Sequence, residues 1–386
     1  GPFFFIGGTN GAAIVSSYCE RKGWKRIYNK QRDDFKLKWC ETKSAANYCN
    51  FREDSQRRGP HHEDRPAQQL RDYEGVSAKI SHGRGPRSRT VSLEAHSPEI
   101  SPHSSRRCVA LCRRPKMAEF IPTTFRMDLR TEREDFFSRY GTVSNIGTKM
   151  WICKPTGLNQ GRGIFLLKSQ DDVTAFRLKL QNAEDSQASQ ASRRTLQRQP
   201  QPYIVQQYIQ NPLLLNGKKF DVRSYLLIAC TCPFVVFFRH GYVRLSCNLY
   251  DPRSSDPSTH LTNQCMQKKN PLYSQLKEDT VWSMESFNTY VNNKFRVAMG
   301  LPWDWVLGTF TKRMQQIMTQ CFFAVKSKLD RRLGFFDLIG CDFLVDADFK
   351  VWLLEMNCNP ALHTNCEVLK EVVPSTVMET LGELEV

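Results

Sequence analysis

No hydrophobic run in this sequence is long enough to cross a membrane. The longest apolar stretch extends from Tyr225 to Phe238 and is interrupted by Thr231 and Pro233. A membrane-spanning helix needs about 20 consecutive apolar residues. The interrupted stretch instead predicts two strands joined by a turn, and we expect no membrane as a partner.

A complete phosphate loop of the P-loop type is also missing. Gly7, Gly8 and Gly11 follow an apolar stretch, but no Lys-Ser or Lys-Thr pair comes after them. The pattern predicts a plain turn between a strand and a helix of about residues 12–22, and a phosphate loop is the alternative. Residues 35–39 then alternate between apolar and polar side chains, as in a half-buried strand.

Regularly spaced cysteines are absent, although the chain contains 14 of them. The pairs Cys108/Cys112 and Cys230/Cys232 do not have the spacing of a zinc site. Irregular cysteines in a chain of this length are typical of reduced, cytosolic thiols. We therefore expect no zinc site and no disulfide framework.

Acidic residues are in the minority, which gives the chain a formal net charge of +16. A basic protein attracts polyanions such as nucleic acid, an anionic membrane or an acidic protein tail. Residues 54–116 contribute much of this charge, contain few large aliphatic side chains and show no period, so we predict disorder there. RNA binding or phosphoregulation is the alternative, but this segment lacks the interleaved aromatic residues that stack on bases, and nucleic acid is not expected as a partner.

Two short apolar stretches near the end of the chain carry isolated polar side chains. Residues 337–346 and 351–360 predict two strands of a hairpin, in which Asp342, Glu355 and Asn357 interrupt the apolar pattern. Glu355 and Asn357 are two apart and share a face, and pairing brings Asp342 beside them. Such hard oxygen ligands suit Mg²⁺. The alternative is structural: Asp342 caps a bend, and Glu355 pairs with a buried arginine.

A second informative stretch covers residues 150–167. It predicts a strand that ends in Lys154, a loop with Gly157, Gly161 and Gly163, and a further strand. Glycines let backbone N–H groups approach phosphate oxygens, and a lysine supplies a positive charge. An ordinary glycine hairpin is the alternative.

A charged strand is predicted at residues 218–228, where Lys219, Asp221 and Arg223 alternate with apolar residues and therefore share one face. The strand continues into fully apolar sequence, so this face is expected to line an internal cleft rather than solvent. The remaining expected elements are a strand at 203–209, strands between 235 and 245, and helices at 131–140, 171–180, 283–298 and 306–329, with a Gln/Ser/Arg-rich loop up to residue 200.

Together these elements resemble the tubulin–tyrosine-ligase-like family, which comprises amino-acid ligases built on an ATP-grasp fold. Five blocks in family order carry the resemblance: Trp151 to Pro155 with Gln160 to Ile164, Val205 to Ile209, Lys219 to Arg223, His260 to Asn263, and Gly340 to Asp342 with Trp352 to Pro360. Asn10 to Ala13, Tyr18-Cys19 and Gly23-Trp24 look most similar to the protein polyglycylase branch. The implied fold class is α/β (α+β), with an ATP-grasp core, a small N-terminal α/β domain and a disordered basic insert.

The resemblance implies roles for individual residues and implies ATP and Mg²⁺ as cofactors. Metal ligands would be Asp342, Glu355 and Asn357. Arg223 and Arg244 would position the carboxylates of the acceptor and of the incoming amino acid, and Lys219 would assist at the phosphates. The nucleotide would contact Lys154, Gln160, Gly161, the hinge residues Gln206, Gln207, Tyr208 and Ile209, and also Lys219, Asp221, Thr262 and Asn263.

The activity implied by the resemblance is ATP-dependent ligation of glycine to glutamate side chains or to glycine chains, through an acyl phosphate. The expected partners are free glycine and the acidic tails of tubulin, microtubules or other acidic proteins. A monomer in the cytoplasm and cytoskeleton is expected, and the resemblance implies that it acts at the cilium or axoneme. Replacing Asp342 or Glu355 by alanine is expected to abolish ligation and to leave the fold largely intact.

Two alternatives stay open. The chain could transfer glutamate, as polyglutamylases do, because the sequence does not identify the pocket for the amino acid. It could also be an inactive protein that binds acidic tails, because residues 54–115 stand where the family has a folded segment before Phe120. The expected domains are 1–53 (partial N-terminal α/β domain), 54–116 (basic segment), 117–203 (central subdomain) and 204–386 (C-terminal subdomain).

Overall fold

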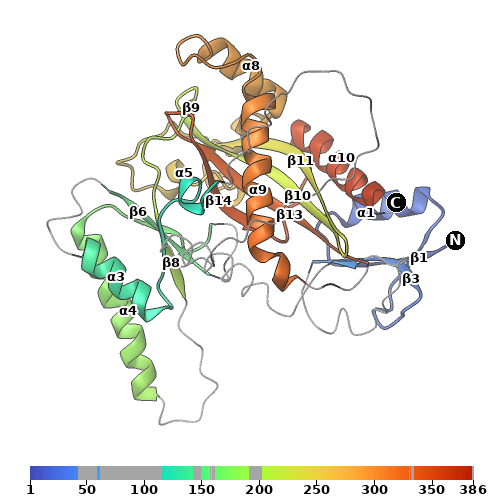
Figure 1. Ribbon diagram of the computed structural model, residues 1–386, viewed down its shortest axis with the longest axis horizontal. Coiled ribbons are helices and arrows are strands. Elements are labelled where there is room, and N and C mark those ends of the chain that lie inside the picture. The colour runs from blue at the N-terminus through green and yellow to red at the C-terminus, as the bar shows by residue number, and fades with distance from the viewer. Residues whose placement is uncertain are drawn as a thin grey trace, which may run out of the picture.

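The computed structural model describes residues 1–41, 59–60, 115–141, 149–156, 158, 161–190, 202–329, 331 and 334–384. In these parts of the chain, two mixed α/β units flank a large antiparallel sheet (Figure 1). The predicted basic segment 54–116 lies outside the described residues, apart from Gly59–Pro60 and residues 115–116. Gln160 and Gly157 also lie outside them.

The large sheet forms the centre of the molecule. Its strands follow the order β12-β11-β10-β13-β14, and every pair along this path is antiparallel. The bounds are β10 Lys218–Thr231, β11 Phe234–Leu245, β12 Val281–Ser283, β13 Phe335–Val345 and β14 Val351–Asn357, with the short β9 (Leu214–Leu215) and β4 (Gly59–Pro60) at its margins. The two strands and the turn predicted around Thr231 are confirmed. The predicted hairpin near the end of the chain is also confirmed, as β13 and β14.

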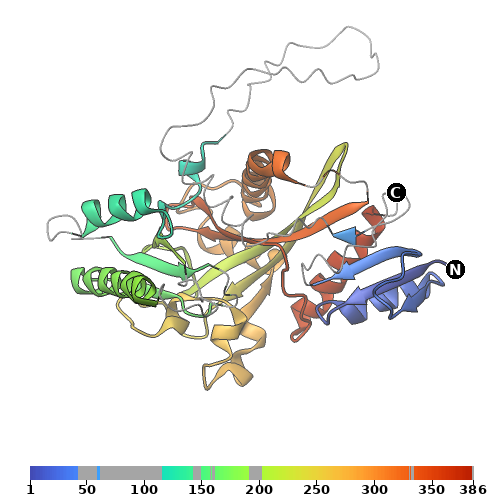
Figure 2. The ribbon, with the colours of Figure 1, turned by 90° about the horizontal axis from the view of Figure 1, so that it is seen from below.

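A helix covers each face of this sheet (Figure 2). Because side chains alternate along a strand, Val222, Leu226 and Ile228 of β10 pack in one core with α9 (Thr311–Val325). Tyr225, Leu227 and Ala229 belong to a second core, with α10 (Glu367–Glu383). Lys219, Asp221 and Arg223 lie at odd positions, on the face opposite to α9, but α10 covers only the later half of that face. The charged half is therefore available to line a site.

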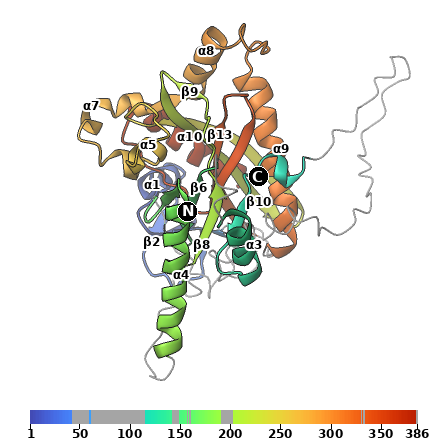
Figure 3. The same cartoon turned by 90° about the vertical axis from the view of Figure 1, so that its left-hand side faces the viewer.

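A four-stranded sheet, in the order β5-β8-β6-β7, lies beside the start of β10 (Figure 3). Its elements are β5 Thr124–Arg126, β6 Trp151–Pro155, β7 Phe165–Leu167 and β8 Tyr203–Gln207, with the helices α3 Arg130–Tyr140 and α4 Gln170–Gln190. An aromatic core that includes Phe125, Phe136 and Trp151 holds α3 against the sheet. The prediction that the helix ends near Leu180 is wrong: α4 continues to Gln190, since Gln, Ala and Glu are good helix formers.

The N-terminal unit is a small parallel sheet in the order β2-β1-β3, with one helix. Its bounds are β1 Phe3–Gly7, α1 Ala12–Arg21, β2 Lys25–Ile27 and β3 Phe35–Cys40, which confirms the two predicted strands and the helix. The expected half-burial of the second strand is wrong, because Lys38 is buried like its neighbours. Residues of β1, α1 and β3 share the second core with α10, so this unit packs on the main body (Figure 1).

Short helices complete the fold: η2 Met117–Glu119, α5 Pro257–His260, α6 Gln264–Gln267, α7 Tyr273–Leu276, η3 Glu278–Thr280, α8 Met284–Lys294, η4 Val306–Phe310 and η5 Lys326–Lys328. The predicted helix 283–298 is thus shorter, and 306–329 consists of η4, α9 and η5. Strands predicted between 235 and 245 form one strand, β11. The predicted boundary at 203/204 falls inside β8, which pairs along its length with β6. Among the described residues, no helix is long and apolar enough to span a membrane.

Candidate active site

Charged side chains gather on one face of four neighbouring strands in the large sheet. Strand β10 contributes Lys219, Asp221 and Arg223, as the alternation predicted. Register then pairs Asp221 with Arg244 of β11 and Arg223 with Asp342 of β13, and Asp342 in turn pairs with Glu355 of β14. All except Glu355 are buried, and Glu355 is half-buried. Burial of this many charges is costly unless they are paired with each other or with a ligand.

Two arginines and two aspartates form a closed network at one end of this face. Arg223 grips Asp342 with two hydrogen bonds, one of them from Nη2 to Oδ2 at 3.0 Å. Arg244 donates to both carboxylate oxygens of Asp221, at 2.6 and 2.7 Å, and its Nη2 also lies 2.7 Å from Oδ2 of Asp342. Bidentate pairs of this kind are among the strongest hydrogen-bonded pairs.

The network fixes the ionisation of its members. Burial alone would raise the pKa of Asp342, but the charges of Arg223 and Arg244 outweigh burial and hold that pKa below its usual range. Burial likewise would lower the pKa of Arg244, and the carboxylates of Asp221 and Asp342 raise it instead. Asp342 is therefore ionised, with both oxygens engaged. The alternative stated from the sequence made Asp342 the cap of a bend and gave a buried arginine to Glu355; in the structure the arginines pair with Asp342 instead.

Glu355 of β14 lies next to Asp342 of β13, but its pKa shifts in the opposite direction. Its pKa is raised, first by burial and then by the negative charge of Asp342, while Lys154 lowers it. The amide of Asn357 donates to Oε1 of Glu355 at 3.1 Å. Two adjacent carboxylates and an amide oxygen form a set of hard donors, and a divalent cation would relieve the repulsion between the acids.

The predicted ligands therefore fit Mg²⁺, on the condition that Asp342 shares its oxygens with the arginines. Among the described residues, no group of three or more His, Cys, Asp or Glu side chains is placed to hold a metal ion. The predicted set contains only two carboxylates, and its third member is an amide. A metal there would thus depend on further oxygen donors, such as phosphate.

Lys219 occupies the other end of the charged face, in a cage of neutral groups. Its Nζ donates to the hydroxyl of Tyr208 and to the carbonyl oxygen of His260, each at 2.9 Å. It also lies 4.3 Å from the centre of the Tyr208 ring and 5.9 Å from that of Tyr250. Burial lowers the pKa of Lys219 to about 7; Asp221 opposes this shift and Lys154 adds to it. An anion placed here would restore the ammonium form.

Lys154 approaches the same region from the four-stranded sheet. Its Nζ donates to Oε1 of Gln206 at 2.8 Å and to the carbonyl oxygen of Leu354 on β14 at 3.4 Å. Gln206 donates in turn to Thr124, at 3.0 Å. Lys154 thus bridges the two sheets, close to both Lys219 and Glu355. Two nearby lysines from facing sheets suit a polyphosphate.

The predicted hinge runs from the end of β8 into the following segment. The N–H groups of Gln207 and Tyr208 donate to the carbonyl oxygens of Thr123 and Met150, at 2.7 and 2.9 Å. Ile209, which follows, is half-buried and extends beyond the strand. These internal hydrogen bonds fix the course of the hinge, and they engage the backbone N–H groups of two residues that the resemblance assigns to nucleotide binding.

The turn at residues 260–263 lies between the hinge and the charged face. Thr262 donates from Oγ1 to Oδ2 of Asp221 at 2.5 Å. Gly161 has a φ of +73°, and a Cβ there would lie 3.1 Å from Met266 and 3.4 Å from Oδ1 of Asn263. The glycine loop therefore needs glycine at this position, for its backbone angle and for its close approach to the turn.

Sequence reasoning assigned Tyr208 only to the hinge and gave His260 no role. In the structure, Tyr208 shares its hydroxyl between Lys219 and Nδ1 of His260, at 2.9 and 2.8 Å. Nε2 of His260 lies 2.7 Å from the carbonyl oxygen of Ser254, so it carries the proton and Nδ1 accepts from Tyr208. The only sequence signal for this contact was that both residues belong to blocks that carry the family resemblance.

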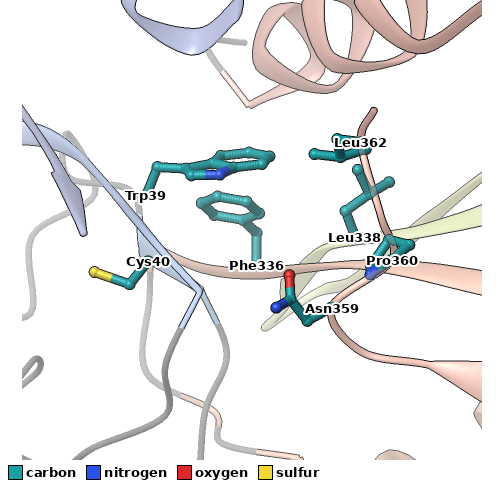
Figure 4. Close-up of a pocket in the computed structure, with 7 residues that line it drawn as sticks. All are labelled: Trp39, Cys40, Phe336, Leu338, Asn359, Pro360 and Leu362. Carbon is teal, nitrogen blue, oxygen red and sulfur yellow. The ribbon is translucent and has the colours of Figure 1, made fainter. Parts of the chain in front are cut away.

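A small hollow lies apart from these charges, between the N-terminal unit and the segment that follows β14. Trp39, Phe336 and Leu362 line it, together with Cys40, Leu338, Asn359 and Pro360 (Figure 4). Its lining includes no Asp, Glu, His, Lys or Arg side chain. The charged face, rather than this hollow, is therefore the candidate active site.

Comparison with known proteins gives a consistent result. The model of the tubulin-tyrosine ligase family matches residues 96–385. The chain is similar to protein polyglycylase TTLL10 of Rattus norvegicus, at 55% identity over 381 residues, which cover 99% of this chain and 52% of that protein. Inactive polyglycylase TTLL10 of Homo sapiens is 53% identical over 390 residues, 99% of this chain and 57% of the relative. Tubulin glycylase 3A of Drosophila melanogaster is 31% identical over 236 residues, 60% of this chain and 22% of the relative. The chain thus spans little more than half the length of its most similar full-coverage relatives.

Proposed function

Because this chain belongs to the tubulin-tyrosine ligase family, we propose that it is an ATP-dependent ligase that joins glycine to glutamate side chains or to glycine chains on acidic protein tails. The observation that carries the proposal is the buried charged face of β10 and its neighbours. There, a lysine cage and an arginine–carboxylate network lie on one surface. Such a surface can bind a polyphosphate at one end and carboxylates at the other.

The lysine end would bind the nucleotide. Lys154 and Lys219 would contact its phosphates, and residues 206–209 with Gly161, Thr262 and Asn263 would surround the rest. Bound Mg·ATP would supply the phosphoryl group that activates the acceptor carboxylate. Its Mg²⁺ would supply positive charge that offsets the negative charge of this group. Asp342, Glu355 and Asn357 would hold the metal, and Gln160 of the glycine loop is proposed as a further phosphate contact from the sequence.

The arginine end would bind the two carboxylates of the reaction. Arg223 and Arg244 are held in fixed orientations by Asp342 and Asp221. A substrate carboxylate would take over part of the guanidinium fork, and this exchange would free an oxygen of Asp342 toward the metal. The arginines then orient the acceptor, while the buried surroundings keep water away from the activated carboxyl group.

Glycine is proposed as the transferred amino acid because the most similar relatives are named polyglycylases. The test is incubation of the full chain with Mg·ATP, tubulin and either labelled glycine or labelled glutamate. Mass spectrometry of the tubulin tails should show additions of glycine only. Addition of glutamate would identify a polyglutamylase, the alternative within the family.

An inactive binder of acidic tails is the second candidate, because the relative from Homo sapiens carries the name inactive polyglycylase at 53% identity. Microtubule co-sedimentation that weakens with salt, combined with nucleotide binding and no incorporation of either amino acid, would favour this candidate. The Glu355→Gln variant serves as the matched control, because it should bind microtubules as the original chain does.

The net charge of +16 supports acidic tails of tubulin or of other acidic proteins as the partner. A cytoskeletal location, with action at the cilium or axoneme, and a monomeric state belong to the same proposal. So does the division into an N-terminal domain, a basic segment and two ATP-grasp subdomains.

A further inference from the structure

The side chain of Asn10 joins the N-terminal unit to the segment that follows β14. Its Nδ2 donates to Oδ1 of Asn359 at 3.0 Å and to the carbonyl oxygen of Pro360 at 2.8 Å. Its Oδ1 accepts from the N–H of Leu362 at 2.7 Å. One amide thus makes three hydrogen bonds to residues about 350 positions away in the chain. Only an amide has both the donors and the acceptor that this contact uses.

The turn that carries Asn10 is itself held on both sides. The indole N–H of Trp39 donates to the carbonyl oxygen of Asn10 at 3.4 Å, and the N–H of Asn10 donates to the carboxylate of Glu41. Gly11 has a φ of +73°, and a Cβ there would lie 2.7 Å from Cδ1 of Leu362. Close contact between the two segments therefore requires glycine beside Asn10.

Pro360 connects this junction to the charged face. It is buried, and a Cβ on Gly340 would lie 2.8 Å from Cβ of Pro360 and 3.1 Å from both Cδ and Nη1 of Arg223. Pro360 and Arg223 therefore both lie close over Gly340, whose partner across the hairpin is Asn357. Figure 4 shows Asn359, Pro360 and Leu362 on the segment beside Trp39. The connection runs from Asn10 to Pro360, and from Pro360 across Gly340 to the guanidinium that binds Asp342.

We propose that Asn10 is a positioning residue for the arginine–carboxylate end of the site: it fixes the Pro360 turn and thereby holds Arg223 and the end of β14 in register. The inference deepens the proposed function and rests on it for the identity of the site. It assigns to the N-terminal unit a part in metal and acceptor binding, without any contact between that unit and substrate. Removal of a group that is hydrogen-bonded directly to a metal ligand typically costs roughly 10–100-fold in metal affinity or activity. Asn10 acts further out, through Arg223, so the lower end of this range is expected.

The test is Asn10→Asp in the full chain. Aspartate keeps an acceptor for Leu362 but places oxygen against the oxygens of Asn359 and Pro360. The expected result is that Mn²⁺ binds the chain saturated with ADP more weakly by roughly tenfold, as measured by electron paramagnetic resonance. The KM for the acceptor should rise by a similar factor, while the affinity for metal-free ADP stays the same. An added negative charge would by itself attract Mn²⁺, so weaker binding reports on position rather than on charge.

The matched control is Asn29→Asp, which adds the same charge to the N-terminal unit and keeps the acceptor for the N–H of Gln31. It should bind Mn²⁺ as the original chain does. Asn359→Ala removes only one of the three hydrogen bonds of Asn10 and should have an intermediate effect. This variant keeps the test decisive if Asn10→Asp fails to fold.

The possible failures are distinguishable. If Asn10→Asp and Asn359→Ala both match the original chain in Mn²⁺ affinity and acceptor KM, the positioning role is wrong, whatever the activity. If the original chain binds no Mn²⁺ even when it is saturated with ADP, the metal assignment of the proposed function is wrong and this inference is overturned with it. If the original chain binds Mn²⁺ but transfers no amino acid, ligase activity is excluded, while a change of Mn²⁺ affinity in the variants still supports the positioning role.

Discussion

The pKa values of the buried cations shift in opposite directions at the two ends of the charged face. Lys219 is buried among a hydroxyl, a carbonyl and aromatic rings, and its pKa is lowered to about 7. Arg223 and Arg244 are equally buried, but carboxylates hold them and raise their pKa values. An anion can join the lysine end without displacing a carboxylate from Lys219. At the arginine end, a substrate carboxylate must compete with Asp221 and Asp342.

This difference assigns nucleotide binding to the lysine end and discrimination between acceptors to the arginine end. The lysine end gains favourable charge when a polyphosphate arrives, so it suits a nucleotide that binds first. The arginine end exchanges one carboxylate for another, so the net gain is small and depends on geometry. Discrimination between acceptors is therefore expected at the arginine end. The predictions below test this contrast, from the largest expected effect to the smallest.

Removal of Asp342 should have the largest effect. Asp342→Ala leaves two buried guanidinium groups with one carboxylate fewer, and breaking a buried pair in this way costs about 3–5 kcal/mol. The free energy of unfolding from urea titration should fall by that amount, contrary to the expectation from sequence that the fold stays largely intact. Asp348→Ala, at the exposed tip of the same hairpin, is the control and should change it by less than about 0.5 kcal/mol. Equal free energies of unfolding for the two variants would show that the network does not stabilise the fold.

Glu355→Gln should separate activity from stability. The raised pKa of Glu355 means that its ionised form is disfavoured in the folded chain, so a neutral amide of the same shape should not lower the free energy of unfolding. Glycine transfer should fall by about 10²–10³-fold, because a charged ligand near the transferring group is lost. The two measurements are labelled-glycine incorporation and urea unfolding. Unchanged incorporation would remove Glu355 from the metal site.

The lysine end should show a pH dependence that the arginine end lacks. Phosphates favour the ammonium form of Lys219, so affinity for metal-free ATP should fall by up to about tenfold per pH unit as pH rises above 7. Calorimetry in buffers of different ionisation enthalpy should detect proton uptake on binding, and Lys219→Met should abolish it. An affinity for metal-free ATP that is constant from pH 6.5 to 8.5 would show that the pKa of Lys219 is not lowered by its surroundings.

The contribution of Lys219 to the stability of the ligand-free chain should rise with pH, whereas the affinity for ATP falls. In the unfolded chain Lys219 keeps its proton up to its usual pKa of 10.5, whereas in the folded chain it loses it near 7. The unfolded state therefore binds more protons between these values, and the contribution of Lys219 to the free energy of unfolding increases with pH across this window. Comparison of the original chain with Lys219→Met by thermal unfolding isolates this contribution.

Tyr208→Phe should give the smallest effect. The variant keeps the ring near Lys219 but removes the hydroxyl that links it to His260. Loss of one such hydrogen bond is worth about 1 kcal/mol, so nucleotide affinity should change by about fivefold. Tyr28→Phe, on an exposed ring, is the control. A loss of nucleotide affinity above about a hundredfold would mean that the hydroxyl contacts the nucleotide itself.

Regular patterns in the sequence predicted much of this molecule. Alternation along β10 located Lys219, Asp221 and Arg223 on one buried face, and spacing in the last hairpin brought Glu355 beside Asp342. These inferences succeeded because a strand has a fixed period of two. The grip of Arg223 on Asp342 was not predicted, because it depends on the register between strands more than 100 residues apart.

The contact of Asn10 was beyond reach for a similar reason. A polar residue in a glycine turn has no periodic signal, and its partners lie at the far end of the chain. The length of α4 was missed for a local reason: residues 181–190 are polar and read as a loop, yet their intrinsic preference is helical. Local propensity there outweighs the absence of an apolar face.

The junction between Asn10 and Leu362 also constrains how the chain is made. The two residues are 352 positions apart. At roughly 5–20 residues per second, a ribosome needs about 20–70 s to travel between them. During that interval β1, α1 and β3 have emerged, but α10, which completes their core, does not yet exist. The strands and helix of this unit are thus made well before the helix that completes their core, and their apolar side chains stay partly uncovered during that interval.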